Sequence, residues 1–278
     1  MKYYIIAGEA SGDLHGSNLI TQIKQLDKNA NIRAWGGDMM QAAGCAIVKH
    51  YKDLAFMGFI EVVMHLNTIL KNLQFCKKDI EAFQPDVVIF IDYPGFNLRI
   101  AQWAKSSGFK TAYYISPQIW AWKENRVQKI KATIDKMIVI LPFEQAFYKK
   151  HNMEVAYVGH PLTEVIQSSL HQISQEALSE KPIIALLPGS RSQEIKNALP
   201  IMMQVTKRFP EYQFIIAQAP GQDASFYESF IKGSDVQLIQ HATYAILKQA
   251  TAALVTSGTA TLETALFGVP QLVCYKAN

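Results

Sequence analysis

Cysteine, long apolar runs and a leader pattern are scarce or absent in this sequence, and each absence excludes a class of protein. The three cysteines, Cys45, Cys76 and Cys274, are odd in number and widely spaced in 278 residues, which argues against a disulfide framework and a zinc site. The sequence contains no run of about 18 apolar residues, which is the length that a helix needs to span a bilayer. The first residues read as a strand and a polar glycine loop rather than as a signal peptide. These features predict a cytoplasmic protein without a bound metal.

Charge of one sign does not dominate either. Lys and Arg number 27 against 23 Asp and Glu, a formal net charge of +4, and the basic residues are spread along the chain. This balance does not require nucleic acid, and it leaves an anionic ligand or a membrane surface open. The composition, 49% hydrophobic and 18% charged, is that of a globular chain with a large core and roughly two domains.

Short apolar runs alternate with helical or loop segments in both halves of the chain. Uninterrupted apolar strands between helices indicate parallel sheets buried on both faces, so we expect an α/β fold with two Rossmann-like doubly wound domains. Strands are expected at residues 3–7, 32–35, 87–91, 111–115, 137–141 and 155–158, and then at 183–187, 213–217, 236–239, 252–255 and 271–274.

A polar stretch divides the two series of strands. We expect an N-terminal domain at residues 1–160, a linker at 161–181 and a C-terminal domain at 182–278. The sequence stops directly after an apolar strand, where a further helix would ordinarily cover the sheet. We therefore expect the C-terminal domain to be incomplete.

The first loop, residues 8–16, joins a strand to a helix, which is where open α/β sheets bind ligands. Glu9, Ser11 and Asp13 offer donors and acceptors to a polyhydroxy compound. The glycine spacing is not that of the dinucleotide fingerprint. The alternative is that Asp13 only caps the helix.

Asp92 directly follows an entirely apolar strand and precedes a proline-glycine turn. Partial desolvation should raise its proton affinity, which makes it a candidate general base. A capping or turn aspartate is an equally good interpretation. The loop at 116–123 carries Gln118 and two tryptophans, which could wall a sugar or an acyl chain, although tryptophans more often pack.

Two loops of the second half resemble phosphate sites. Residues 187–194 place Ser190 and Arg191 at a helix start, where a guanidinium can hold a phosphate, with a capping box as the alternative. Residues 256–263 place Ser257, Gly258 and Thr259 at another helix start that suits a diphosphate. Glu263 could accept a hydrogen bond from a ribose hydroxyl.

A helix is expected at residues 59–75 with an unusually broad apolar surface. Its members include Ile60, Met64, Leu66 and Ile69. Such a surface, next to several lysines, could enter a membrane interface or line an acyl-chain groove, although packing on two sides is the commoner cause.

Taken together, six ordered motifs resemble the lipid-A-disaccharide synthase family. They lie at residues 7–16, 116–122, 141–144, 158–162, 187–191 and 256–263. The resemblance implies an inverting, metal-independent glycosyltransferase of the GT-B type, without a cofactor, in Gram-negative bacteria. Members transfer 2,3-diacylglucosamine from UDP to 2,3-diacylglucosamine 1-phosphate and so make the β-1,6-linked lipid A disaccharide.

The resemblance also implies roles for individual residues. Asp92 would be the general base, and the N-terminal domain would bind the acceptor through Glu9, Ser11, Asp13 and Gln118. The C-terminal domain would bind UDP through Ser190, Arg191, Ser257, Gly258, Thr259 and, at the ribose, Glu263. The family often has a second aspartate where this chain has Gly95, which weakens any claim that the loop needs two carboxylates.

The same resemblance implies a peripheral position on the cytoplasmic side of the inner membrane, a homodimer for the full-length form, and no nucleic-acid partner. Members continue for roughly another hundred residues, so we expect this 278-residue chain to be weakly active or inactive. Three alternatives remain open. The chain could be another GT-B UDP-sugar transferase, a UDP-sugar epimerase, or a non-catalytic UDP-sugar-binding protein associated with a membrane.

Overall fold

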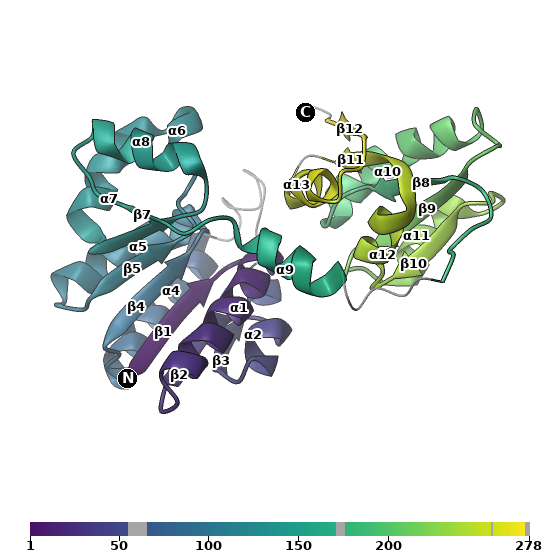
Figure 1. Cartoon of the computed structure of the whole chain (residues 1–278). Helices are drawn as coiled ribbons and strands as arrows, with labels where there is room; N and C mark the ends of the chain where they lie inside the picture. The colour runs from purple at the N-terminus through teal and green to yellow at the C-terminus, as the bar shows by residue number, and fades with distance from the viewer. Residues whose placement is uncertain (55–65, 171–175, 257, 276–278) are drawn as a thin grey trace. The chain divides into compact units, whose positions relative to one another are not determined.

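The computed structural model describes residues 1–54, 66–170, 176–256 and 258–275. The chain divides into two compact units, Met1–Pro161 and Leu162–Asn278 (Figure 1). Each unit is an α/β structure built on its own parallel sheet, as the alternating pattern predicts.

The sheet of the first unit has the strand order β3-β2-β1-β4-β5-β6-β7, and all its neighbouring strands are parallel. The strands are β1 (Lys2–Ala7), β2 (Asn31–Gly36), β3 (Ala46–His50), β4 (Val87–Ile91), β5 (Thr111–Tyr114), β6 (Lys136–Val139) and β7 (Ala156–Tyr157). The helices are α1 (Ala10–Leu26), α2 (Asp38–Ala42), α4 (Leu66–Phe83), α5 (Pro94–Ser106), α6 (Ile119–Trp122), α7 (Val127–Thr133) and α8 (Pro142–Lys150), with the short 3₁₀ turns η1 (Tyr51–Leu54) and η2 (Glu124–Arg126).

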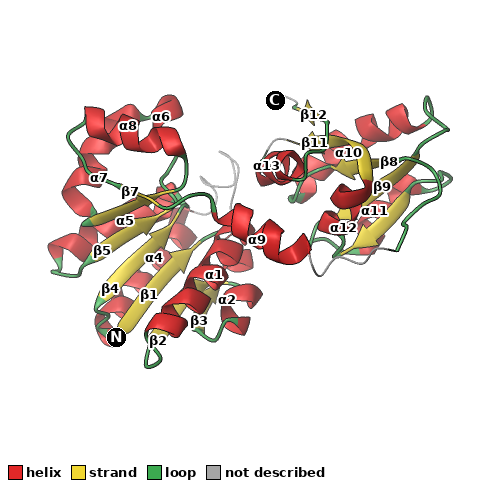
Figure 2. Ribbon diagram, viewed as in Figure 1, coloured by secondary structure: helices red, strands yellow, loops and turns green. Residues whose placement is uncertain are grey.

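Alternate residues of the central strands enter two different cores. In β1, Tyr4 and Ile6 pack with α4, α5, α7 and α8, whereas Ile5 and Ala7 pack with α1 and α2 on the opposite face. Helices therefore cover both faces of the sheet (Figure 2). This is why the strands read as uninterrupted apolar runs.

The strand β3 was missed by the sequence analysis. It forms one edge of the sheet, and none of its residues is fully buried. Its sequence ends in Lys49 and His50, so it lacks the continuous apolar run of a central strand.

The second unit contains a sheet with the order β10-β9-β8-β11-β12, also parallel throughout. Its strands are β8 (Ile183–Leu187), β9 (Gln213–Gln218), β10 (Gln237–Gln240), β11 (Ala250–Thr256) and β12 (Gln271–Cys274). Helices α10 (Ser192–Thr206) and α11 (Ala224–Ile231) cover one face, and α12 (Thr243–Gln249) and α13 (Thr259–Leu266) cover the other. Helix α9 (Pro161–Leu170) occupies the first half of the segment expected to be a linker.

Each sheet has one point where the strand order reverses. In the first unit it lies between β1 and β4, and in the second between β8 and β11. Ligands of open α/β sheets bind at the carboxyl ends of the strands at such a point. The loops that the sequence analysis singled out after β1, β4, β8 and β11 are the four loops at these two positions.

Candidate active site

The backbone is left-handed where β4 and β5 end. Asp92 has φ 42°, Tyr93 φ 50° and Ile115 φ 68°, although none of them is glycine. Each such residue costs on the order of 1–3 kcal/mol, and these conformations persist only where the surroundings enforce them. The strain gathers beside the point of strand reversal, which is a mark of a functional site.

Two buried side chains hold this strained segment. Asn97 of α5 donates through Nδ2 to the carbonyl oxygens of Asp92 (2.7 Å), Ile91 (3.2 Å) and Ile6 (3.3 Å). The Tyr113 hydroxyl of β5 donates to the same Asp92 carbonyl oxygen at 2.5 Å. Such bonds each contribute about 1 kcal/mol net, so together they offset part of the strain. Neither residue is marked as functional by the sequence.

The carboxyl group of Asp92 has a raised proton affinity. Burial is the main cause and the negative charge of Glu9 the second, and together they raise the pKa of Asp92 to about 6. A hydrogen bond from the Tyr93 backbone amide acts in the opposite direction. A carboxylate with this pKa is ionised at neutral pH and still basic enough to take a proton from a hydroxyl group that is losing it.

Gly8 is required by the packing of Tyr93 rather than by its own φ. A Cβ atom at Gly8 would lie 2.3 Å from the Tyr93 ring. The ring also stacks on Phe96, with centroids 5.7 Å apart. The loop after β1 and the loop after β4 therefore pack directly on each other, which explains the glycine at this position.

Asp13 has a structural task within the first loop. Its buried carboxylate accepts hydrogen bonds from the backbone amides of Gly37 (2.7 Å), Met40 (3.0 Å) and Met39 (3.1 Å), at the start of α2. It thus caps α2 and not its own helix, a partner that the sequence could not show. Of the other residues expected to bind the acceptor, Glu9 and Ser11 are half-buried and Gln118 is exposed.

A pair of histidines was also missed by the sequence analysis. His15 of α1 is buried, and its ring meets that of His160 edge-on with centroids 6.1 Å apart. Burial, with His160 as the second cause, lowers the pKa of His15 to about 4, and burial lowers the pKa of His160. Both rings are therefore neutral at physiological pH.

In the tryptophan-containing loop after β5, the side chain of Trp120 packs against a neighbouring aromatic ring. The ring of Trp120 meets that of Phe143 edge-on, with centroids 4.8 Å apart. Nearby, the buried Glu144 accepts from the backbone amides of Leu141 and Ile140, and the hydroxyl groups of Ser116 and Tyr148 are 2.7 Å apart. These contacts favour the packing interpretation for Trp120.

In the second unit, the loop after β8 has its donors occupied. The backbone amides of Ser190 and Arg191 donate to Glu194 Oε2 at 3.1 and 3.3 Å, and Arg191 Nη1 lies 2.7 Å from Glu194 Oε1. Gly189 permits the turn with φ 116°. The capping arrangement considered as the alternative is thus present, and an anion here would have to replace Glu194.

The loop after β11 leads into α13 through Gly258, whose φ of 146° favours glycine. Thr259 is exposed as the first residue of the helix, and Ser257 lies outside the described residues. Glu263 is not free, because the Tyr244 hydroxyl donates to it at 2.9 Å. Burial raises the pKa of Glu263, against the effect of that hydrogen bond.

The residues expected to face lipid can be checked only in part. Ile60 and Met64 lie outside the described residues, Leu66 is the first residue of α4, and Ile69 is half-buried. Further along α4, Leu70 and Phe75 are exposed, at 50% and 47%. In the parts of the chain that the structure describes, no helix is both long and apolar enough to cross a membrane.

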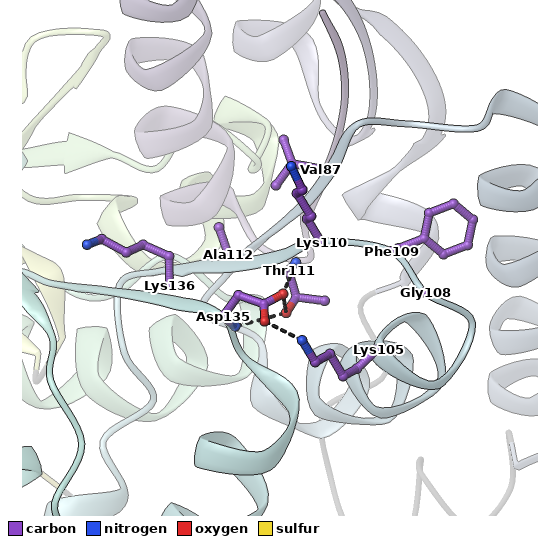
Figure 3. A pocket seen from close by; sticks show the side chains of 9 residues that line it. All are labelled: Val87, Lys105, Gly108, Phe109, Lys110, Thr111, Ala112, Asp135 and Lys136. Atoms are coloured by element: carbon purple, nitrogen blue, oxygen red, sulfur yellow. Dashed lines mark hydrogen bonds and ion pairs between the residues drawn. The ribbon is translucent and has the colours of Figure 1, made fainter.

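A cavity of about 460 Å³ lies at the opposite edge of the first sheet, at the amino ends of β4, β5 and β6 (Figure 3). Its acidic residue, Asp135, is paired with Lys105 and accepts from the backbone amide and hydroxyl of Thr111. These bonds pair Asp135 within the cavity wall. The loops at the strand reversal lie at the other, carboxyl ends of the strands.

Known proteins resemble this chain along nearly its whole length. The profile of the lipid-A-disaccharide synthetase family matches residues 3–278. The lipid-A-disaccharide synthase of Geobacter metallireducens is 39% identical over 286 aligned positions, covering 99% of this chain and 74% of the relative. That of Coxiella burnetii is 41% identical over 280 positions, covering 98% and 74%.

Solved structures show the same fold at low identity. A UDP-GlcNAc 2-epimerase from Neisseria meningitidis bound to UDP-GlcNAc superimposes with a TM-score of 0.73 at 12% identity, covering 98% of this chain and 82% of the other. The Methanocaldococcus jannaschii UDP-GlcNAc 2-epimerase gives 0.66 at 15%, covering 98% and 83%. These likenesses confirm the expected GT-B type of α/β fold and nothing finer. The sequence matches go further: the chain belongs to the lipid-A-disaccharide synthase family of glycosyltransferases.

Proposed function

We propose that this chain transfers 2,3-diacylglucosamine from UDP to the 6-hydroxyl of 2,3-diacylglucosamine 1-phosphate, forming the β-1,6-linked disaccharide 1-phosphate. The observation that carries the proposal is the Asp92 carboxyl group, which stands at the strand reversal of the first sheet with its pKa raised to about 6. Family membership supplies the reaction class.

In the proposed reaction, the Asp92 carboxylate accepts the proton of the acceptor hydroxyl. The hydroxyl oxygen attacks the anomeric carbon, and the bond between that carbon and the UDP oxygen breaks. Its electron pair leaves with UDP, and a single displacement inverts the anomeric centre. Because burial and Glu9 both favour the protonated form of Asp92, the base gains driving force for taking the proton.

The second unit is proposed to hold UDP. Arg191 already pairs with the carboxylate of Glu194, and a phosphate can accept the same forked donors. Backbone amides at the start of α13, after Gly258, would add donors to the negative charge that develops on the leaving group. Ser190, Ser257 and Thr259 complete this proposed set, and Glu263 with Tyr244 would meet the ribose.

The first unit is proposed to bind the acceptor. Glu9, Ser11 and Gln118 offer polar groups to its hydroxyls, while Asp13 acts on the pocket by holding α2. We also propose contact with the inner membrane through α4, where the exposed Leu70 and Phe75 lie beside Lys71 and Lys78. A cytoplasmic location, and a homodimer for the full-length form, are both implied by the resemblance and belong to the same proposal.

Epimerisation of a UDP-sugar is the second candidate, because the structural neighbours named above are UDP-GlcNAc 2-epimerases. The two reactions differ in their need for an acceptor. An epimerase acts on the UDP-sugar alone, whereas a transferase releases UDP only when the acceptor sugar is present.

The deciding experiment incubates the chain in detergent micelles with UDP-2,3-diacylglucosamine, with and without 2,3-diacylglucosamine 1-phosphate. We expect UDP and a disaccharide 1-phosphate, formed slowly and detected by mass spectrometry, only when both substrates are present. Non-acylated UDP-GlcNAc with its 1-phosphate serves as the matched control and should react far more slowly. Epimerised donor without acceptor, or equal rates for acylated and non-acylated pairs, would contradict the proposal.

A further inference from the structure

The carbonyl oxygen of Asp92 is held by two buried side chains from different elements. Asn97 of α5 donates to it at 2.7 Å, and the Tyr113 hydroxyl of β5 donates at 2.5 Å. Both residues are fully buried. These two hydrogen bonds therefore fix the orientation of the peptide group between Asp92 and Tyr93.

Asn97 also ties together the two strands that flank the strand reversal. The same Nδ2 atom lies 3.3 Å from the Ile6 carbonyl oxygen of β1 and 3.2 Å from that of Ile91 in β4. One amide group thus contacts the carboxyl ends of both strands. Glu9 lies in the loop after β1, and Asp92 directly follows β4.

These contacts act on the orientation of the Asp92 side chain. Asp92 and Tyr93 are both left-handed, a conformation that side chains disfavour, so the segment would relax without an outside constraint. The direction of the Cα–Cβ bond follows from the backbone angles, so a fixed peptide plane fixes the direction in which the Asp92 side chain leaves the backbone.

We propose that Asn97 and Tyr113 are positioning residues, which hold the Asp92 peptide in its left-handed conformation so that the carboxyl group is presented to the acceptor hydroxyl. This inference rests on the proposed role of Asp92 as the general base. If the two residues had a purely structural role, replacing them would lower only the stability of the fold. If they position Asp92, replacing them also changes the titration of Asp92 and the turnover of the protein.

The test compares Tyr113→Phe and Asn97→Ala with the wild-type chain. Tyr113→Phe keeps the ring in the core and removes only the hydroxyl, so it decides the matter even if Asn97→Ala does not fold. Tyr4→Phe is the matched control, because Tyr4 is an equally buried tyrosine whose hydroxyl bonds Asp79 and Trp35 instead. Asp92→Asn identifies the Asp92 signal and removes the base.

Two readouts are used. The first is an NMR titration of protein labelled with ¹³C at the aspartate carboxyl carbon, which does not depend on turnover. The second is kcat and KM for both substrates. In Tyr113→Phe we expect Asp92 to titrate below pH 6, towards its usual 3.8, because the released carboxyl group gains solvent. We expect kcat to fall on the order of tenfold with KM nearly unchanged, a part of what a general base contributes.

Tyr4→Phe should keep both the titration and kcat of the wild type, whatever its loss of stability. The inference is overturned if Tyr113→Phe and any folded Asn97→Ala titrate at Asp92 near pH 6 with wild-type kcat. Full turnover by Asp92→Asn is a different result. It would refute the base assignment, while the NMR titration would still decide whether the two residues position the carboxyl group.

Discussion

Glu9 and Asp92 follow two neighbouring strands, and the negative charge of Glu9 reaches Asp92. After burial, this charge is the second cause of the raised pKa of Asp92. Glu9 stands at the N-terminus of α1 and Asp92 at the end of β4, so only the pairing of β1 with β4 brings them together. The sheet topology therefore supplies the second of the two causes that raise the proton affinity of the proposed base.

Replacing Glu9 by Gln should lower the pKa of Asp92, because one of its two raising causes is removed while burial remains. The acid limb of kcat/KM should then move to lower pH, by less than about one unit. The measurement is the pH dependence of kcat/KM between about pH 4.5 and 8. Glu154→Gln, an exposed glutamate of the same unit, is the control. An unmoved acid limb in Glu9→Gln would show that the two carboxylates do not interact.

Asp92→Asn should lose activity and gain stability. Turnover should fall by about 10²- to 10⁴-fold, the contribution of a general base, with UDP affinity unchanged. Folding raises the pKa of Asp92 from its usual 3.8 to about 6. The folded state therefore binds the proton more tightly, and stability falls as the pH rises through this window.

Above pH 6 the loss of folding stability is constant. It is at most about 3 kcal/mol, because the pKa of Asp92 rises from 3.8 to about 6 on folding and each pKa unit corresponds to 1.36 kcal/mol. The asparagine cannot ionise and avoids the loss. Its free energy of unfolding should exceed that of the wild type at pH 8 and approach it at pH 4.5, measured by urea denaturation. A variant less stable than wild type at pH 8 would show that the carboxylate is not destabilising there.

The sequence predicted the elements of the fold better than their contacts. Continuous apolar runs marked the central strands because those strands are buried on both faces, whereas the edge strand β3 carries no such run. The loops of the site were identified because they follow strands, and strand ends meet at one edge in a parallel sheet.

What the sequence could not show are partners far apart along the chain. Asp13 read as a possible cap of its own helix, yet it caps α2. No sequence pattern marks Asn97, because its role depends on carbonyl groups of β1 and β4. The left-handed φ of Asp92 and Tyr93 is held by hydrogen bonds from residues elsewhere in the fold. Neither residue is glycine, so the sequence does not indicate this conformation.

Gly8→Ala should damage the site by forcing Tyr93 away. The new Cβ atom would lie 2.3 Å from the Tyr93 ring, so the loop after β4 must shift. We expect a loss of about 1–3 kcal/mol in unfolding free energy, as for other overpacked positions, together with reduced turnover. Gly95→Ala is the matched control, because a Cβ atom there meets nothing within 4 Å and alanine favours the helix. Equal behaviour of the two variants would exclude the steric explanation.

Asp13→Asn should destabilise the first unit without changing UDP affinity. Its carboxylate accepts three backbone amides, and an amide group would turn a donor towards one of them, at a cost of about 1–3 kcal/mol. Tryptophan fluorescence during urea unfolding reports this unit selectively, because the four tryptophans all precede residue 161. The exposed Asp38→Asn should cost less than about 1 kcal/mol. A milder effect at Asp13 than at Asp38 would refute the capping role.

Arg191→Ala should weaken the binding of UDP to the second unit. Its guanidinium lies at the N-terminus of α10 beside the proposed diphosphate site, and hydrogen bonds to charged groups contribute about 1.5–3 kcal/mol. The expected loss in affinity is therefore on the order of 10- to 100-fold by isothermal titration calorimetry. Arg208→Ala is the matched control, since Arg208 is exposed just beyond the other end of the same helix. If Arg191→Ala binds UDP as tightly as Arg208→Ala, Arg191 serves only to pair with Glu194, and the phosphate must be held elsewhere.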